Sequence, residues 1–233
     1  MACQPLEVSI DDGSPRVKKG ASISSILNWT RLEVAQFCAS GIRTGEPVII
    51  GIDHAFSFPT SYMQRYGIES WDQFLDDFMR HWPTADPHTY VDFLRDNNPR
   101  TGDSTELRLC EQWTAGPKSV FHFDVQGQVA TSTHAGLPWL LWLRMMFEAK
   151  ASIHFWPFDG FDVPEGKSVI AEVYPSLFRR RYAKQGRTPD EHDAYCIADC
   201  PLLVSLAGEP LASWPAGSPL RSGLRNGLLL CLL

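Results

Sequence analysis

The amino-acid sequence predicts an α/β (α+β mixed) domain in which helices flank a β-sheet. Short apolar runs typical of buried strands alternate with longer runs of helical periodicity, and Pro or Gly separates many of them. The chain has 233 residues, of which 44% are hydrophobic, so it can bury one sizeable core. We predict a single domain over residues 1–210, with a loop or insertion at 84–118, and a divergent tail at 211–233.

The first part of the chain predicts a hairpin, two helices and one strand. Residues 5–20 alternate apolar and polar side chains around an Asp-Gly pair, which is a hairpin signal. Residues 24–41 have a helical pattern that ends at a glycine. PVIIGID (47–53) is a continuous apolar run, typical of a buried parallel strand. WDQFLDDFMRHW (71–82) has apolar residues at helical spacing and stops before a proline, so it predicts an amphipathic helix.

The second part of the chain predicts three more strands and three more helices. The helix at 188–198 begins with a capping box, in which Thr188 precedes Glu191 by three residues. The helix at 137–150 is expected to carry Pro138 in its first turn, where a missing N–H costs nothing. The remaining predicted elements are strands at 119–125, 152–158 and 168–174, and a helix at 175–183.

Carboxylates lie at the ends of three of these elements. Asp53 ends the strand 47–53, Glu172 lies near the end of the strand 168–174, and Asp190 and Asp193 lie on one face in the first turns of the last helix. Groups at the carboxyl ends of strands in an open α/β sheet converge on one crevice. Converging carboxylates repel one another unless a hard cation such as Mg²⁺ or Mn²⁺ neutralises them. A pair of such ions can activate water for phosphodiester hydrolysis.

Each carboxylate also has a purely structural alternative. Asp190 and Asp193 could simply favour the helix dipole. Glu172 could pair with one of the arginines at 179–181, and Asp53 could cap a turn.

Five segments together resemble the domain of unknown function family 429, whose members are predicted nucleases of the ribonuclease H-like superfamily. They are GIDHAFSFP, KSVFHFDVQGQVATSTHAGLPWL, HFWPFDGF, IAEVYPSLF and DEHDAYCIA, within about residues 45–200. The resemblance implies a ribonuclease H-like mixed sheet of five strands, flanked by helices, with its first three strands antiparallel. It also implies metal-dependent cleavage of nucleic acid. Asp53, Glu172 and Asp193 would hold Mg²⁺ or Mn²⁺, with Asp190 assisting catalysis.

The sequence departs from the family pattern at both ends. The superfamily normally opens on a central strand with another metal-binding Asp, whereas this chain begins near the expected second and third strands. We therefore expect the first strand to be absent, with Asp11 as an alternative source of the carboxylate. Pro201 interrupts the last helix, and the tail resembles nothing in the family. The alternative to a nuclease is a catalytically inactive ribonuclease H-like module, or a truncated product, with a binding or structural role.

Other polar residues are candidates for substrate contacts. Lys118 could meet a substrate phosphate or be an exposed loop lysine. His134, expected at a loop-to-helix junction, could shuttle protons or donate to phosphate, or be a hydrogen-bonded structural residue. His54 and Ser57 could orient Asp53. The aromatic run at 154–161 could stack on bases or pack in the core.

The composition of the chain restricts which binding partners and which cellular location we expect. The net charge of −6 is not that of a general nucleic-acid binder, although RRRYAKQGR (179–187) could make a local contact or be a solvated helix end. No window approaches the roughly 20 apolar residues of a membrane span, and the N-terminus has no secretory pattern, so we expect a cytoplasmic protein. Oligomeric state is not predicted.

The six cysteines predict reduced thiols, since they include no CxxC pair. His192, Cys196 and Cys200 share one helical stripe and could bind zinc, but a fourth ligand is not apparent. A buried stripe is the favoured interpretation.

Overall fold

Three short strands form a parallel sheet in the order β1-β3-β2. They are β1 (Ile49–Ile52), β2 (Ile153–Trp156) and β3 (Ser168–Glu172). The computed structural model describes residues 30–112, 118–124, 129–147, 152–177 and 179–198. The predicted mixed α/β class is confirmed. The antiparallel strands expected from the hairpin at 5–20 lie outside the described residues.

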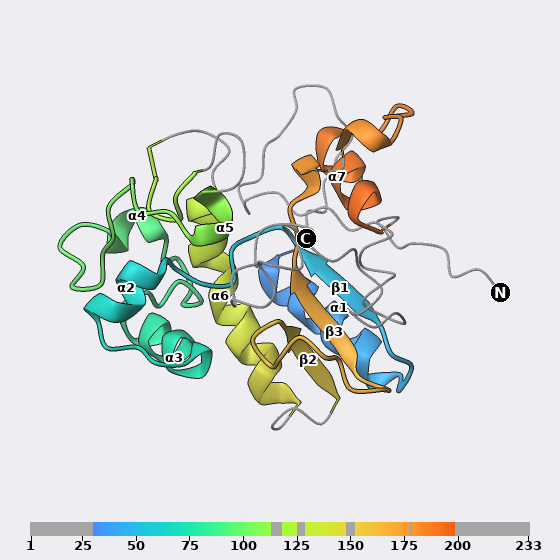
Figure 1. Ribbon diagram of the computed structural model, residues 1–233, viewed down its shortest axis with the longest axis horizontal. Helices are drawn as coiled ribbons and strands as arrows, with labels where there is room; N and C mark the ends of the chain where they lie inside the picture. Colours follow the sequence, from blue (N-terminus) through green and yellow to red (C-terminus); the bar gives the residue numbers. More distant parts are fainter. Residues whose placement is uncertain (1–29, 113–117, 125–128, 148–151, 178, 199–233) are drawn as a thin grey trace, which may run out of the picture.

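Helices pack around the sheet, and a further group of helices lies to one side of it (Figure 1). Helix α6 runs between the sheet and the group formed by α2, α3 and α4, and it packs on both α1 and α3. Helix α7 lies beyond the carboxyl ends of β1 and β3. The helices are α1 (Arg31–Arg43), α2 (Thr60–Arg65), α3 (Trp71–His81), α4 (Val91–Leu94), α5 (Leu109–Gln112), α6 (Val129–Met146) and α7 (Pro189–Ala198), with 3₁₀ helices η2 (Pro175–Leu177) and η3 (Arg179–Arg181).

Capping hydrogen bonds define where helices α3, α7 and α1 begin. Helix α3 begins where the Ser70 side chain accepts from the Gln73 N–H at 3.2 Å, and it ends before Pro83 as predicted. The capping box of α7 is confirmed, because Thr188 and Glu191 exchange both bonds. Helix α1 has a second capping box, so it begins at Arg31.

The predicted strand at 119–125 is wrong for residues 119–124, which form a turn. The Ser119 side chain donates to the Glu106 carbonyl at 2.6 Å and accepts from the Phe121 N–H at 3.1 Å. These side-chain bonds compete with strand pairing for the backbone groups. Val120 and Phe121 are therefore both buried, although they are consecutive in the chain.

The predicted start of the helix at 137–150 is also wrong, because α6 already begins at Val129. Pro138 lies in its interior and has no N–H to donate to the His134 carbonyl, four residues earlier. The Thr84 hydroxyl donates to that carbonyl instead. This long-range bond satisfies the acceptor that the proline leaves unpaired, so the helix continues through it.

Two further expectations change in detail. The segment predicted as a helix at 175–183 forms the two short 3₁₀ helices η2 and η3. The insertion at 84–118 is not a plain loop, because it contains α4 and α5. The boundaries predicted for the domain and the tail, at 210 and 211, lie outside the described residues.

The core is an aromatic cluster centred on Phe58, just after β1. Its ring centroid lies 4.9 Å from that of Tyr62, 5.0 Å from Phe74 and 4.8 Å from Phe121. The aromatic run at 154–161 also packs inward, since Phe155 and Trp156 are buried and Phe158 stacks on Trp71. Core packing, rather than base stacking, accounts for Phe155, Trp156 and Phe158.

Candidate functional site

The parallel register brings two of the predicted carboxylates to one edge of the sheet. Ile52 is aligned with Glu172, so Asp53 directly follows the residue opposite Glu172. Helix α7 brings Asp193 to the same edge by packing closely on β1. A Cβ atom at Gly51 would lie only 2.7 Å from Ile197 Cγ2 and 2.8 Å from Val173 Cγ1. Glycine at position 51 therefore permits the approach of α7 that places Asp193 near Asp53.

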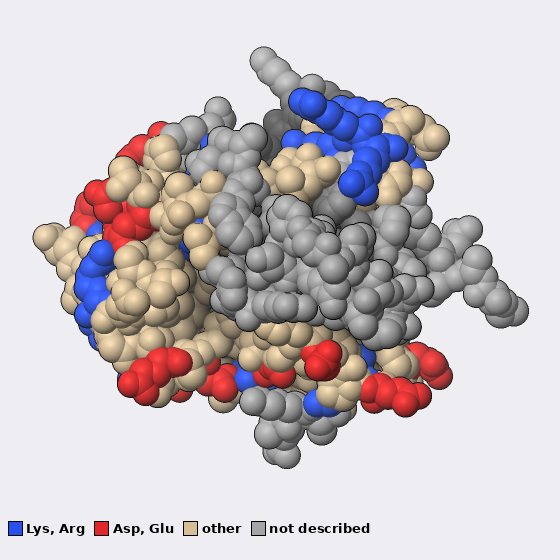
Figure 2. Space-filling view, in the orientation of Figure 1, with Lys and Arg blue, Asp and Glu red and all other residues tan. Residues whose placement is uncertain are grey.

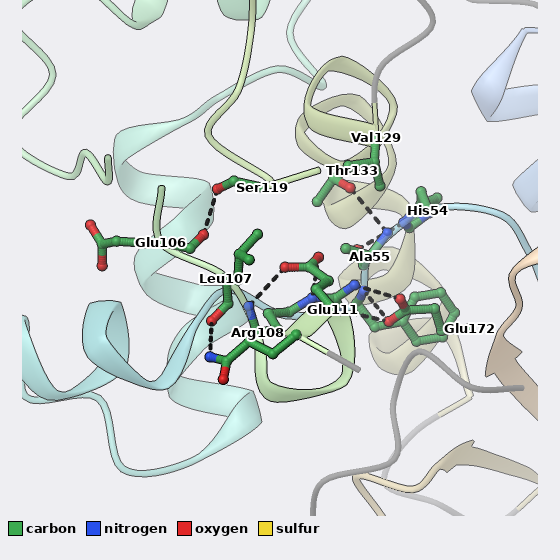
Figure 3. A network of polar contacts seen from close by, with 12 residues as sticks. His54, Ala55, Glu106, Leu107, Arg108, Glu111, Ser119, Val129, Thr133 and Glu172 are labelled. Atoms are coloured by element: carbon green, nitrogen blue, oxygen red, sulfur yellow. Dashed lines mark hydrogen bonds and ion pairs between the residues drawn. The ribbon is translucent and has the colours of Figure 1, made fainter. Parts of the chain in front are cut away.

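Glu172 is buried and bound by an arginine that the sequence pattern did not single out. Arg108 Nη1 and Nη2 donate to the two Glu172 oxygens at 2.9 and 2.7 Å (Figure 3). The Phe56 N–H donates to Glu172 Oε2 at 2.9 Å. The prediction had offered residues 179–181 as alternative partners. Their place is taken by Arg108, which lies 64 positions away in the sequence.

Arg108 also binds Glu111, so one guanidinium lies between two buried carboxylates. Its Nε donates to Glu111 Oε1 at 2.9 Å, and its backbone N–H donates to Oε2 at 2.7 Å (Figure 3). Burial raises the pKa of Glu111, and the charge of Arg108 opposes this increase. The bidentate geometry and the extra N–H donors are what a buried ion cluster needs to offset desolvation.

The chain after β1 is held in place by several other contacts. The Ala55 N–H donates to the Thr133 hydroxyl on α6 at 3.0 Å (Figure 3). The His54 ring packs so tightly on α6 that any Cβ atom at Gly136 would overlap it. Burial lowers the pKa of His54 to about 4, so this imidazole is neutral near pH 7. Its Nδ1 contacts the Ala55 carbonyl, so His54 fixes the segment after Asp53 by packing.

Asp193 is also paired with an arginine. Arg179 Nε and Nη2 donate to its two carboxylate oxygens. The backbone carbonyl of Arg179 lies 3.2 Å from His192 Nε2, which ties η3 to α7. In contrast to the Arg108 pair, this one faces solvent on its arginine side: the Arg179 side chain is 51% exposed and that of Asp193 is 14% exposed.

Asp53 interacts with both of the other carboxylates. The residue retains contact with solvent, yet partial burial raises the pKa of its carboxyl to about 7. The negative charges of Asp193 and Glu172 raise this pKa further, and the positive charge of Arg179 lowers it. The charges of Asp193 and Glu172 therefore both act on Asp53, while the role of the three carboxylates as a metal site stays a prediction. Nevertheless, across the described ranges no group of three acidic, His or Cys side chains is arranged to hold a metal ion.

We expect Asp53→Asn to stabilise the protein more at pH 8 than at pH 5. The folded-state pKa of Asp53 lies above its unfolded value, so its contribution to stability is present at low pH and is lost as pH rises toward and through about 7. Solvent screening limits the gain in melting temperature to about 3 °C or less. Thermal unfolding in chelator-containing buffer at both pH values measures it. The exposed Asp92→Asn variant is the control, and an equal gain in both variants would contradict the explanation.

The other predicted site residues lie in different surroundings. Asp190 is exposed in the first turn of α7, and Lys118 is exposed beside the 119–124 turn, so their roles stay predictions. His134 is fully buried within α6, not at a loop-to-helix junction. Aromatic rings surround it, including Trp82 at 4.6 Å, and burial lowers its pKa to about 3. His134 is thus a neutral core residue here, as the structural alternative held, and we leave it out of the site.

Four residues around the site were missed by sequence reasoning, namely Arg108, Glu111, Thr133 and Gly136. Arg108 had one local signal, since Glu111 follows it at a spacing of three. Thr133 and Gly136 had no distinguishing signal, because their importance comes from contacts with the segment after β1.

The stripe of His192 and Cys196 is a buried face of α7. Both residues are buried, and the Cys196 sulfur lies 3.7 Å from His192 Nε2. Cys200, the third member of the zinc alternative, lies outside the described residues. The described cysteines Cys38, Cys110 and Cys196 are free thiols, in line with the prediction.

No family model, no curated protein and no solved structure matches this chain. Within the part of the chain that the structure describes, no helix is both long and apolar enough to cross a bilayer.

Proposed function

We propose that the protein is a divalent-metal-dependent phosphodiester hydrolase that acts on nucleic acid, with Asp53 and Asp193 as the cation ligands. The observation behind this proposal is that the sheet register places Asp53 directly after the residue opposite Glu172, and that α7, which carries Asp193, lies beyond the same edge of the sheet. Three segments far apart in the sequence bring like charges together there, which is costly unless cations are present. The ribonuclease H-like fold and the cytoplasmic location remain part of this proposal.

The three-carboxylate ligand set does not fit the described arrangement, whereas a two-carboxylate set does. Both Glu172 oxygens accept hydrogen bonds from Arg108. Asp53 reaches solvent, and among the described residues the partner that holds Asp193 is an arginine that is half exposed. Opening a pair of this kind costs about 0–1 kcal/mol. Mg²⁺ commonly takes one or two carboxylates and keeps several water ligands, so Asp53 and Asp193 are a sufficient pair.

When bound, Mg²⁺ or Mn²⁺ would supply a Lewis acid and lower the pKa of a bound water. The residues of the chain have separate tasks. Asp53 is a ligand only when it is ionised, so cation binding should strengthen as pH rises through about 7. Glu172 has a positioning role, because it accepts from the Phe56 N–H and so fixes the chain just after Asp53. Asp190 lies exposed on the helix that carries Asp193.

The second candidate function is a catalytically inactive module that binds nucleic acid or has a structural role. The observation that favours it is that Glu172 and Asp193 are each already neutralised by an arginine. In that case the ion pairs would be permanent structural contacts.

Cation binding and hydrolysis distinguish the two candidates. We expect Mn²⁺ to raise the melting temperature of the wild type but not that of Asp53→Asn or Asp193→Asn. With single-stranded, duplex and hybrid substrates, both variants should lose at least about 100-fold in rate, because loss of even an outer contact to a metal ligand costs about 10–100-fold. Asp92→Asn, on the distant helix α4, is the matched control.

Two results would count against the hydrolase. Equal activity in Asp193→Asn and wild type would remove Asp193 from the site. Binding of nucleic acid without hydrolysis, and without any effect of Mn²⁺, would favour the inactive module instead.

A further inference from the structure

We propose that Arg179 is a phosphate-sensitive gate on the cation site: it holds Asp193 in the resting protein and releases it when a phosphate group of the substrate binds the guanidinium. This inference rests on the proposed function, since it assigns a regulator to the same site. It predicts that a phosphate-like anion and the divalent cation help each other to bind.

The first observation is that Arg179 binds both carboxylate oxygens of Asp193. Its Nε and Nη2 donate to the two oxygens, so the positive charge of the guanidinium lies on the side where a cation held by both oxygens would lie. The Asp193 side chain is 14% exposed, so little of it faces solvent beside the guanidinium. Cation binding at Asp193 therefore requires the guanidinium to move.

The second observation is that the charge of Arg179 acts on both proposed ligands. The guanidinium is bound directly to Asp193. Its charge also lowers the pKa of Asp53. The positive charges of the guanidinium and of a cation compete, so the site can hold the cation well only after Arg179 finds another anion.

The third observation is that a phosphate could reach Arg179. Its side chain is 51% exposed, so one side of the guanidinium faces solvent. Arg180, Arg181 and Lys184 are exposed nearby, and Figure 2 shows a patch of Lys and Arg side chains in the region of η3 and α7. Arg187 packs over the Tyr195 ring at 3.7 Å, at the border of this patch. Although the net charge of the chain is −6, the positive charges of this patch attract anions to it.

The chemistry of the guanidinium allows the exchange. Arginine binds carboxylate and phosphate with the same planar, bidentate geometry, so a phosphate oxygen pair can replace the Asp193 oxygens directly. The anion and the cation therefore each favour the state in which the ion pair of Arg179 and Asp193 is open. Linkage requires that the anion strengthens cation binding by the same factor as the cation strengthens anion binding.

The test measures Mn²⁺ affinity from the free-ion signal in electron paramagnetic resonance, not from activity. Sulfate is the anion probe, because it is tetrahedral like phosphate and stays in solution with Mn²⁺. Chloride at equal ionic strength and a protein-free blank correct for screening and for ion pairing in solution. In the wild type we expect sulfate to tighten Mn²⁺ binding by up to about 5-fold, because the anion can relieve no more than the cost of opening this partly exposed ion pair.

Arg179→Gln should bind Mn²⁺ more tightly than the wild type without sulfate, and sulfate should no longer affect its affinity. Arg180→Gln is the matched control, because it removes the same charge from the same 3₁₀ turn and leaves the pair of Arg179 and Asp193 in place. We expect Arg180→Gln to keep the sulfate effect. An equal gain in Mn²⁺ affinity in both variants would overturn the gate in favour of a general charge effect.

The remaining outcomes separate the two proposals. The wild type could bind Mn²⁺ with an affinity that neither sulfate nor the Arg179→Gln substitution changes. That result would overturn the gate and leave the proposed cation site intact. The absence of Mn²⁺ binding in every variant, including Arg179→Gln, would overturn the cation site and the gate together.

Discussion

Arg108→Met is expected to lower the free energy of unfolding by about 3–5 kcal/mol at pH 7, since breaking a buried ion pair leaves an uncompensated charge. Arg108 lies between Glu172 and Glu111, and all three side chains are at most 8% exposed. Without the guanidinium, two carboxylates would remain buried close to each other. Urea denaturation, followed by tryptophan fluorescence, measures the loss.

The loss should depend on pH in a defined direction. The folded-state pKa of Glu111 is already raised by burial, and removal of Arg108 raises it further. A raised pKa means that stability is present at low pH and is lost as pH rises through the folded value. Arg108→Met should therefore come closer to the wild type at pH 5 than at pH 8.

Arg95→Met is the matched control for this experiment. Arg95 pairs with Asp124 at 3.0 Å, but both side chains are much more exposed, at 35% and 79%. We expect a change of about 1 kcal/mol or less. Similar losses in both arginine variants would mean that burial of the Arg108 cluster has no special effect on stability.

Phe58→Ala is expected to destabilise the protein by about 3–5 kcal/mol, the range for large-to-small changes in aromatic cores. Phe58 is buried and its ring contacts Tyr62, Phe74, Phe78, Phe121 and His134. The five rings come from α2, α3, α6 and the 119–124 turn, whose backbones are fixed by their own contacts, so the rings cannot close the space that the missing side chain leaves. The same denaturation measurement applies.

Phe93→Ala supplies the comparison, because Phe93 is 74% exposed on α4. Surface changes of this kind stay within about 0.5 kcal/mol. Phe58 also lies five residues after Asp53, so Phe58→Ala should loosen the segment that positions the site. Cation affinity that falls in Phe58→Ala but not in Phe93→Ala would show this link; unchanged affinity in both would contradict it.

The elements predicted correctly are those whose pattern is complete within a short stretch of sequence. The helix at 71–82 has both its apolar face and its stop before Pro83, and the capping box at Thr188 and Glu191 is formed by residues three apart. The strands at 47–53 and 168–174 are continuous apolar runs, and both are present. Local propensity and burial point to the same structure in each case.

The elements predicted wrongly depend on distant partners. SVFHFDV has the composition of a strand, but Ser119 bonds to the Glu106 carbonyl and the segment turns into the core. Pro138 was expected to begin a helix, yet Thr84 supplies the hydrogen bond that lets α6 continue through it. In both cases a hydrogen bond between a side chain and a backbone carbonyl far away in the sequence decides the structure.

The sequence by itself determined the mixed α/β class and the placement of Asp53 and Glu172 at the ends of their strands and of Asp193 in the first turns of its helix, because apolar periodicity and chain direction are local properties. The tertiary structure alone decided what neutralises them: Arg108 for Glu172 and Arg179 for Asp193. A buried charge must be paired, but any arginine in the chain can satisfy that need. Which arginine does so depends on the packing of the whole fold.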